Sequence, residues 1–204
     1  MKANSTNKTK THKSYRIFDW IDILLYLFMA FQFIRLWVSP SPDDAELVYY
    51  FAILMAFEFI LAHSGVFMAI MPPKVSILIF FPIYGLFALC FTSMIGDLSI
   101  VWVYLIVVFN RMRFAFMNVD PDEKMRVIGM SALTAIIYFF LIFIIAFCSG
   151  FIPELGLTKD YLEQSGYENI KTIGGLFTDE PNVPMCFGAI YYILIALMEF
   201  KIKK

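Results

Sequence analysis

Long apolar stretches alternate with short polar turns along this chain. The apolar stretches cover residues 18–38, 47–71, 75–95, 98–117, 127–149 and 185–200. At about 1.5 Å per residue, the stretch at 47–71 makes a helix of about 37 Å, which exceeds the hydrocarbon thickness of a bilayer, about 30 Å. The pattern therefore predicts an all-α protein, a polytopic bundle of six transmembrane helices.

The polar connections mark the ends of these predicted helices. Residues 1–17 form a polar, basic tail ahead of the first helix. Prolines close the turns at 39–44 and 72–74, because proline cannot continue a helix. Inside the third helix, Pro82 and Gly85 predict a kink unless neighbouring helices restore the hydrogen bonds.

The segment 150–184 is the one long connection between predicted helices. It is rich in glycine, proline and acidic residues and is too polar to cross a membrane. A short amphipathic helix is expected near Thr158, lying over the mouth of the bundle. Its apolar positions, and those that follow it, are Tyr161, Leu162, Ile170 and Ile173.

The distribution of basic residues predicts the orientation of the bundle. Of the 16 lysines and arginines, all but Arg35, Lys159 and Lys171 fall in the tail, at residues 201–204, or in the loops and helix ends of one side. The positive-inside rule then places both termini in the cytoplasm. The outer side is acidic, which would either attract cations or simply form a solvated face.

The composition agrees with a membrane protein. The chain is 60% hydrophobic with a mean hydropathy of +0.74, which is far more apolar than a soluble domain of this length. A net charge of −1 without a basic groove argues against a nucleic-acid partner. We expect a bacterial cytoplasmic membrane, with the lipid bilayer, a second copy or another membrane protein as partners and no cofactor.

Three polar residues, Glu58, His63 and Ser64, lie in the middle of the stretch 47–71. A charged acid at this depth costs about 3 kcal/mol on insertion scales, so the bundle must compensate it. Asn110 and Arg111 lie at a similar depth in the fourth stretch, and we hypothesise a contact between them and Glu58. The alternative is that Arg111 reaches the cytoplasmic headgroups, with Glu58 protonated or bonded to nearby backbone.

The face that carries Glu58 also carries Ala62, Gly65 and Ala69, a stripe of small residues that allows close helix approach and directs Glu58 into the bundle. His63 lies about 140° around the helix from Glu58, so the two do not form a ligand pair on one face. His63 is either an interhelical hydrogen bonder or part of a proton or ligand path. No metal site is expected from this spacing.

Gln32 and Arg35 share one face near the outer end of the first helix. Arg35 is expected to extend toward the outer headgroups. It would otherwise bind an anionic headgroup or substrate, or pair with an acid of the outer loops.

Each of the three cysteines falls near the outer end of a predicted helix. Cys148 and Cys186 flank the long outer loop and would form a disulfide if that side is oxidising. Packing as small hydrophobic residues is the alternative, and it also suits Cys90.

Three segments give the chain a resemblance to known proteins: Glu58-Phe-Ile-Leu-Ala-His63-Ser64, Pro153-Glu-Leu-Gly-Leu, and the run from Pro184 to Tyr191-Tyr192. Together they resemble bacterial six-helix integral-membrane proteins of unknown function. The resemblance implies a six-helix bacterial membrane protein and carries over no activity and no functional residue.

The sequence carries none of the Ser-His-Asp, Walker, Rossmann or paired-cysteine motifs, which argues against catalysis of the soluble-enzyme type. The leading hypothesis is an accessory or structural membrane component. A small transporter or channel with a protonatable site at Glu58 and His63 is the first alternative, and an intramembrane enzyme acting on lipid is the second.

Overall fold

The structure, a computed structural model, describes residue 20 and residues 23–95 and 121–202. All regular structure in these ranges is helical, which confirms the predicted all-α class. The fourth predicted helix, 98–117, lies outside the described residues, and so do Asn110 and Arg111.

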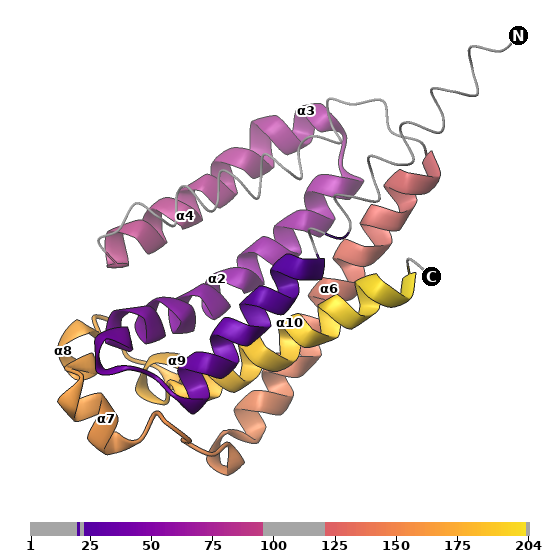
Figure 1. Cartoon of the computed structure of the whole chain (residues 1–204). Helices are drawn as coiled ribbons and strands as arrows, with labels where there is room; N and C mark the ends of the chain where they lie inside the picture. The colour runs from indigo at the N-terminus through magenta and orange to yellow at the C-terminus, as the bar shows by residue number, and fades with distance from the viewer. Residues whose placement is uncertain (1–19, 21–22, 96–120, 203–204) are drawn as a thin grey trace, which may run out of the picture.

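The N-terminal helix, α2 and α4 run alternately up and down, and α6 and α10 form a second antiparallel pair joined by an ordered segment (Figure 1). Their bounds are: an N-terminal helix Ile23–Val38; η1 Pro42–Asp44; α2 Ala45–Ile70; α3 Pro73–Val75; η2 Ser76–Phe80; α4 Phe81–Ile95; α6 Pro121–Phe147; η3 Ser149–Phe151; α7 Lys159–Gln164; α8 Tyr167–Ile170; α9 Leu176–Asp179; and α10 Asn182–Ile202.

Two helical stretches of the described chain are long and apolar enough to cross a membrane by themselves. They are Ile128–Phe147 in α6 and Asn182–Lys201 in α10. These lengths are consistent with membrane association, but they do not confirm six crossings.

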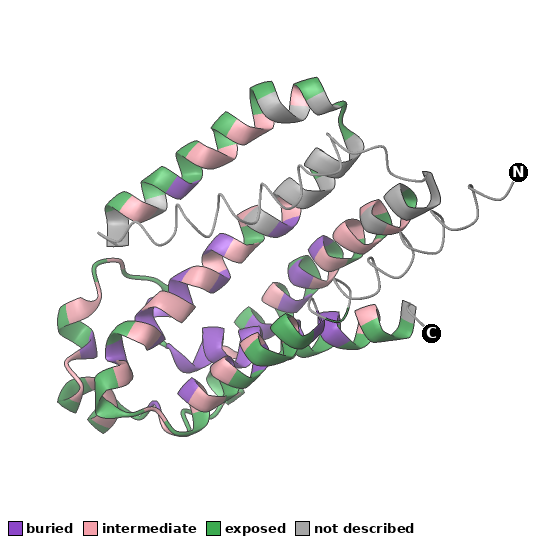
Figure 2. Ribbon diagram, turned by 45° about the horizontal axis from the view of Figure 1, so that its top comes forward, coloured by how far each residue is buried: buried purple, intermediate pink, exposed green. Residues whose placement is uncertain are grey.

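The core lies where α10 meets α2, α6 and the N-terminal helix. All residues from 181 to 189 are buried, so the first half of α10 is enclosed on every side (Figure 2). Helix α2 packs along α6 and also contacts α8, α9 and α10. By contrast, Ala88 is the one buried residue among the described side chains of α4.

The outward faces of the helices are as apolar as their inward faces. In an apolar run of 18 consecutive residues within Ile128–Phe147, 17% of the residues are buried. The exposed positions of that helix include Ile136, Phe139, Phe140, Phe143 and Ile144. A helix in water places polar residues on its exposed face, so these helices suit apolar surroundings.

The expected distortion of the third apolar stretch is found just ahead of Pro82. Residues Ser76–Phe80 form a π-helical turn between α3 and α4. Proline lacks an N–H and its ring collides with the carbonyl four residues earlier, at Leu78. The wider turn provides the local rearrangement that lets Pro82 continue into α4.

Gly188 allows the N-terminal helix to touch the backbone of α10. A Cβ atom at this position would lie 2.5 Å from the ring of Phe33, which is fully buried. The ring of Phe33 also packs at 4.8 Å from Phe51 of α2 and 5.7 Å from Tyr192. One aromatic side chain therefore joins three helices, and the absence of a side chain at Gly188 makes room for it.

Gly188→Ala should destabilise the fold by about 1–3 kcal/mol, because the new methyl group overpacks a buried ring that has little space to move. The measurement is the unfolding midpoint in detergent micelles. Gly129→Ala in α6 is the matched control, since nothing lies within 4 Å of its Cβ position. Equal midpoints for the two variants would contradict the close contact.

Candidate functional site

Glu58 of α2 receives both of its described hydrogen bonds from α10. It lies 13 residues after Ala45 and 12 before Ile70, at the middle of the helix. The hydroxyl of Tyr191 donates to Oε1 at 3.2 Å, and that of Tyr192 donates to Oε2 at 3.5 Å. Each carboxylate oxygen therefore has a phenol donor from the same neighbouring helix.

Four tyrosines from three helices surround this carboxylate, and we call them the tyrosine cluster: Tyr26, Tyr138, Tyr191 and Tyr192. The rings of Tyr191 and Tyr192 lie 5.2 Å apart, and Tyr138 meets Tyr191 edge to face at 5.4 Å. Tyr26 of the N-terminal helix stacks on Tyr192 at 6.4 Å. Edge-to-face packing of this kind is favourable for aromatic pairs.

Tyr138 of α6 adds a second link between helices in the cluster. Its hydroxyl donates to the backbone carbonyl of Met55 at 2.5 Å, three residues before Glu58. Tyr138 and Tyr191 are fully buried. The rings that carry the hydroxyl groups are thus held by packing, which restricts the hydroxyls to the positions that meet α2.

The cluster can hold a carboxylate away from water. At 3.2 and 3.5 Å, both bonds to Glu58 are longer than the about 2.5–2.7 Å typical of a hydroxyl bound to an ionised carboxylate, so each one is weak. A protonated Glu58 would instead have one O–H to donate and fewer lone pairs to offer. The arrangement therefore suits either a structural link or a proton-binding group. No group of three or more metal-binding side chains occurs in the described ranges.

His63 makes its described hydrogen bond within its own helix. Its Nδ1 lies 2.7 Å from the carbonyl oxygen of Phe59, and the two rings are 4.2 Å apart. Because a carbonyl accepts, Nδ1 carries the proton in this contact. Ser64 lies in α2, but its side chain is not described. Asn110 and Arg111 lie outside the described residues, so their contacts with Glu58 remain predictions.

The two phenol bonds to Glu58 should differ in strength. Tyr191→Phe should destabilise the protein by about 1–3 kcal/mol, the usual cost of removing a buried partner. Tyr192→Phe should cost less, because its bond is longer. Unfolding in micelles is the measurement, with Tyr84→Phe on α4 as the control.

A double-mutant cycle with Glu58→Gln identifies the acceptor. Tyr191→Phe should cost less in the Glu58→Gln protein than in the native one, since the amide accepts a weaker bond than a carboxylate. The same cost in both backgrounds would mean that Tyr191 acts through packing alone.

At the end of the bundle where the N-terminal helix turns into α2, Arg35 pairs with Asp44. The guanidinium Nη1 and Nη2 lie 2.9 and 3.2 Å from the two carboxylate oxygens, and the backbone N–H of Ser41 donates to the same carboxylate at 2.7 Å. Three roles were considered for Arg35, and the contact seen in the structure is the pairing with an acid, Asp44. Gln32 is half-buried on the same helix.

This pair changes the titration of Asp44. The hydrogen bond from Arg35 is the largest influence and holds the pKa of Asp44 below its ordinary value of 3.8, against the opposing effect of burial. The ion pair therefore stabilises the fold above that ordinary value. This contribution is lost as the pH falls through the folded pKa.

Arg35→Gln should raise the pKa of Asp44 toward its ordinary value, since the largest cause of the lowering is removed. A carboxyl NMR titration of Asp44 in native and variant protein measures the change. Asp43→Asn is the control, because Asp43 is exposed beside the pair and should leave the titration of Asp44 nearly unchanged. An identical Asp44 midpoint with and without Arg35 would contradict this effect.

The segment after α6 forms a cap over one end of the bundle, which we define as residues 149–181. The predicted amphipathic helix is present as α7, where the Thr158 side chain accepts a hydrogen bond from the backbone N–H of Tyr161. The four apolar positions expected to face the bundle all pack against the core: Tyr161, Leu162, Ile170 and Ile173.

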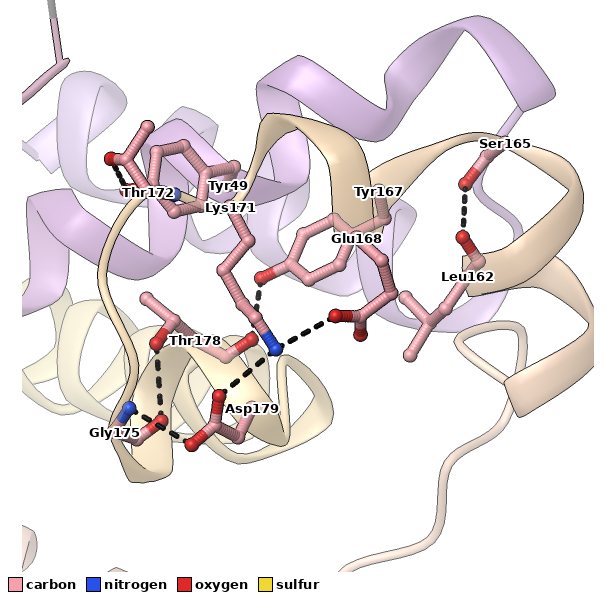
Figure 3. Close-up of polar contacts among 10 residues, drawn as sticks. All are labelled: Tyr49, Leu162, Ser165, Tyr167, Glu168, Lys171, Thr172, Gly175, Thr178 and Asp179. Carbon is pink, nitrogen blue, oxygen red and sulfur yellow. Dashed lines mark hydrogen bonds and ion pairs between the residues drawn. The ribbon is translucent and has the colours of Figure 1, made fainter.

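Polar contacts hold the last part of the cap in shape (Figure 3). The ammonium group of Lys171 lies 2.8 Å from Glu168 and 3.0 Å from Asp179. Asp179 also accepts the backbone N–H of Gly175 at 2.9 Å. The hydrogen bonds that Asp179 accepts, that from Lys171 foremost, lower the pKa of Asp179. The hydrogen bonds that Lys171 donates to Glu168 and Asp179 raise the pKa of Lys171.

Several hydrogen bonds fasten the cap to the helix ends or to itself. Tyr49 of α2 meets Thr172 at 2.8 Å, with either hydroxyl as donor. The buried Tyr167 donates to the carbonyl of Thr178 at 3.0 Å. Outside Figure 3, Trp37 donates to the carbonyl of Pro153 at 2.8 Å and Tyr161 to that of Ser41 at 2.9 Å.

Cys148 and Cys186 are both free thiols in this structure. Cys148 is exposed after the end of α6, whereas Cys186 is buried in the first half of α10. The buried thiol of Cys186 packs as a small apolar group.

Comparison with protein families, with curated proteins and with solved structures finds no match to this chain. The site is therefore interpreted from its own geometry.

The tyrosine partners of Glu58 are the part of the site that sequence reasoning missed. A usable signal was present, because Tyr191 lies nine residues after Asn182 and Glu58 lies 13 after Ala45, and both helices begin at the same end. Two adjacent tyrosines about one turn from the depth of the half-buried Glu58 are candidate donors to it.

Proposed function

We propose that this chain is a multi-pass protein of a bacterial cytoplasmic membrane, with six spans and both termini in the cytoplasm, and that it serves as an accessory or structural component. The apolar outward faces of α6 and of the N-terminal helix support the membrane location. The one-sided distribution of lysine and arginine supports the orientation.

The observation that best supports a structural role is the hydrogen bonding of Glu58. Both oxygens of its carboxylate meet phenol groups of the same chain, on rings that are buried in the helix packing. An acid used in transport must exchange protons or ions with water during its cycle. A carboxylate bonded on both oxygens by neighbouring tyrosines is better suited to joining α2 to α10.

The outer cap supports the same role. Its hydrogen bonds to Trp37, Tyr49 and Ser41 fix it to the ends of the first two helices. A cap attached in this way presents a constant surface on the outer side of the membrane. A constant surface serves a component that holds a partner in place.

Purified protein in lipid vesicles separates this role from transport. Glu58→Gln should lower the unfolding midpoint, and neither native nor variant protein should carry a proton flux above that of empty vesicles, followed with an entrapped pH-sensitive dye. Glu163→Gln, on the exposed surface of α7, is the matched control for loss of one acid.

Two outcomes would contradict the structural role. One is a proton flux through the native protein that disappears in Glu58→Gln while the variant stays folded. The other is an unchanged unfolding midpoint in Glu58→Gln, since a structural link must contribute to stability.

A further inference from the structure

The most exposed large apolar side chains of the described residues lie together in sequence at the outer end of α6. Phe147 is 85% exposed and Phe151 is 88% exposed. Leu155, in the same connection, is 47% exposed. Exposing three large apolar groups within nine residues to water carries a substantial free-energy cost, so these groups favour an apolar environment.

The backbone around these residues is held in place. Phe151 ends the turn η3, in which its N–H bonds to the carbonyl of Cys148 at 2.9 Å and the N–H of Ile152 bonds to that of Ser149 at 3.0 Å. Ile152 packs against the core, and the carbonyl of Pro153 accepts the Trp37 bond. Phe151 is thus projected outward from a fixed turn.

Leu155 is held outward by an unfavourable backbone conformation. Its φ of 51° is positive, and no other non-glycine residue of the described chain shares this feature. Residues with a Cβ atom disfavour this region. Gly156, the next residue, is also held in place, because its N–H donates to the carbonyl of Trp37 at 3.0 Å. The chain therefore keeps an exposed leucine where a polar turn residue would suit water better.

The depth of these residues follows from the length of α6. The stretch Ile128–Phe147 has 20 residues and so extends about 30 Å, the thickness of the hydrocarbon layer. Phe147 then lies at its outer edge, and Phe151 lies just beyond it. Phenylalanine and leucine side chains of surface-lying segments bury themselves at this boundary between headgroups and acyl chains.

We propose that Phe147, Phe151 and Leu155 insert into the boundary between the hydrocarbon and the headgroups of the outer leaflet, so that lipid covers this edge of the cap. The inference rests on the proposed membrane location. Lipid is the occupant because the surface continues the exposed apolar face of α6, through Phe140 and Phe143, without a polar break before Cys148.

Nitroxide spin labels measure this depth directly. The native cysteines are replaced by alanine, and single cysteines are introduced as Phe151→Cys, Phe140→Cys and Glu163→Cys. The protein is placed in vesicles of phosphatidylethanolamine and phosphatidylglycerol. Collision rates are then measured with oxygen, which concentrates in hydrocarbon, and with a neutral nickel chelate, which concentrates in water.

The label at position 151 should have a ratio of oxygen to nickel collisions several-fold above that at 163 and below that at 140. Leu155→Cys should read close to position 151. Helix content by circular dichroism confirms that each labelled protein is folded.

Three results would overturn the inference. If the collision ratio of the label at 151 equals that at 163 while the label at 140 lies in hydrocarbon, the loop lies in water. The membrane location would then still stand. A label at 151 shielded from both reagents would mean that protein covers this edge. A label at 140 that reads as water would remove the membrane location and the inference together.

Discussion

The apolar outward faces of the helices impose the condition that the rest of the structure satisfies. In the proposed membrane location, polar groups in the middle of such helices lack bulk water beside them, which favours partners within the chain. Glu58 meets two phenols, Tyr138 meets a backbone carbonyl, and His63 bonds to its own helix. At the outer end, where water is close, ion pairs such as Arg35 with Asp44 take over.

The helical architecture was predictable because it depends on local properties of the chain. Apolar stretches broken by proline and charge gave the second helix as 47–71, and the structure has it at Ala45–Ile70. The cap helix near Thr158 was also found, since its spacing of apolar residues is local. Its neighbours Ile170 and Ile173 pack inward as expected, but from α8 and from the turn after it.

The partners of the candidate site were not predictable, because helix order does not follow from hydropathy. Tyr191 and Tyr192 look in sequence like any aromatic pair in an apolar helix, and only the packing of α10 on α2 turns them toward Glu58. Three roles for Arg35 stayed open for a similar reason. The short turn η1, which brings Asp44 back over the first helix, distinguishes them.

The contact between Phe33 and Gly188 has a consequence for biosynthesis. The two residues are 155 positions apart, from 33 to 188. At about 5–20 residues per second, roughly 8–30 s pass between their appearances on the ribosome. Throughout that interval the inner face of the N-terminal helix lacks the neighbour that covers it in the folded protein. Helix α10 then has to enter between helices that are already in place, so its arrival completes the packing of the others.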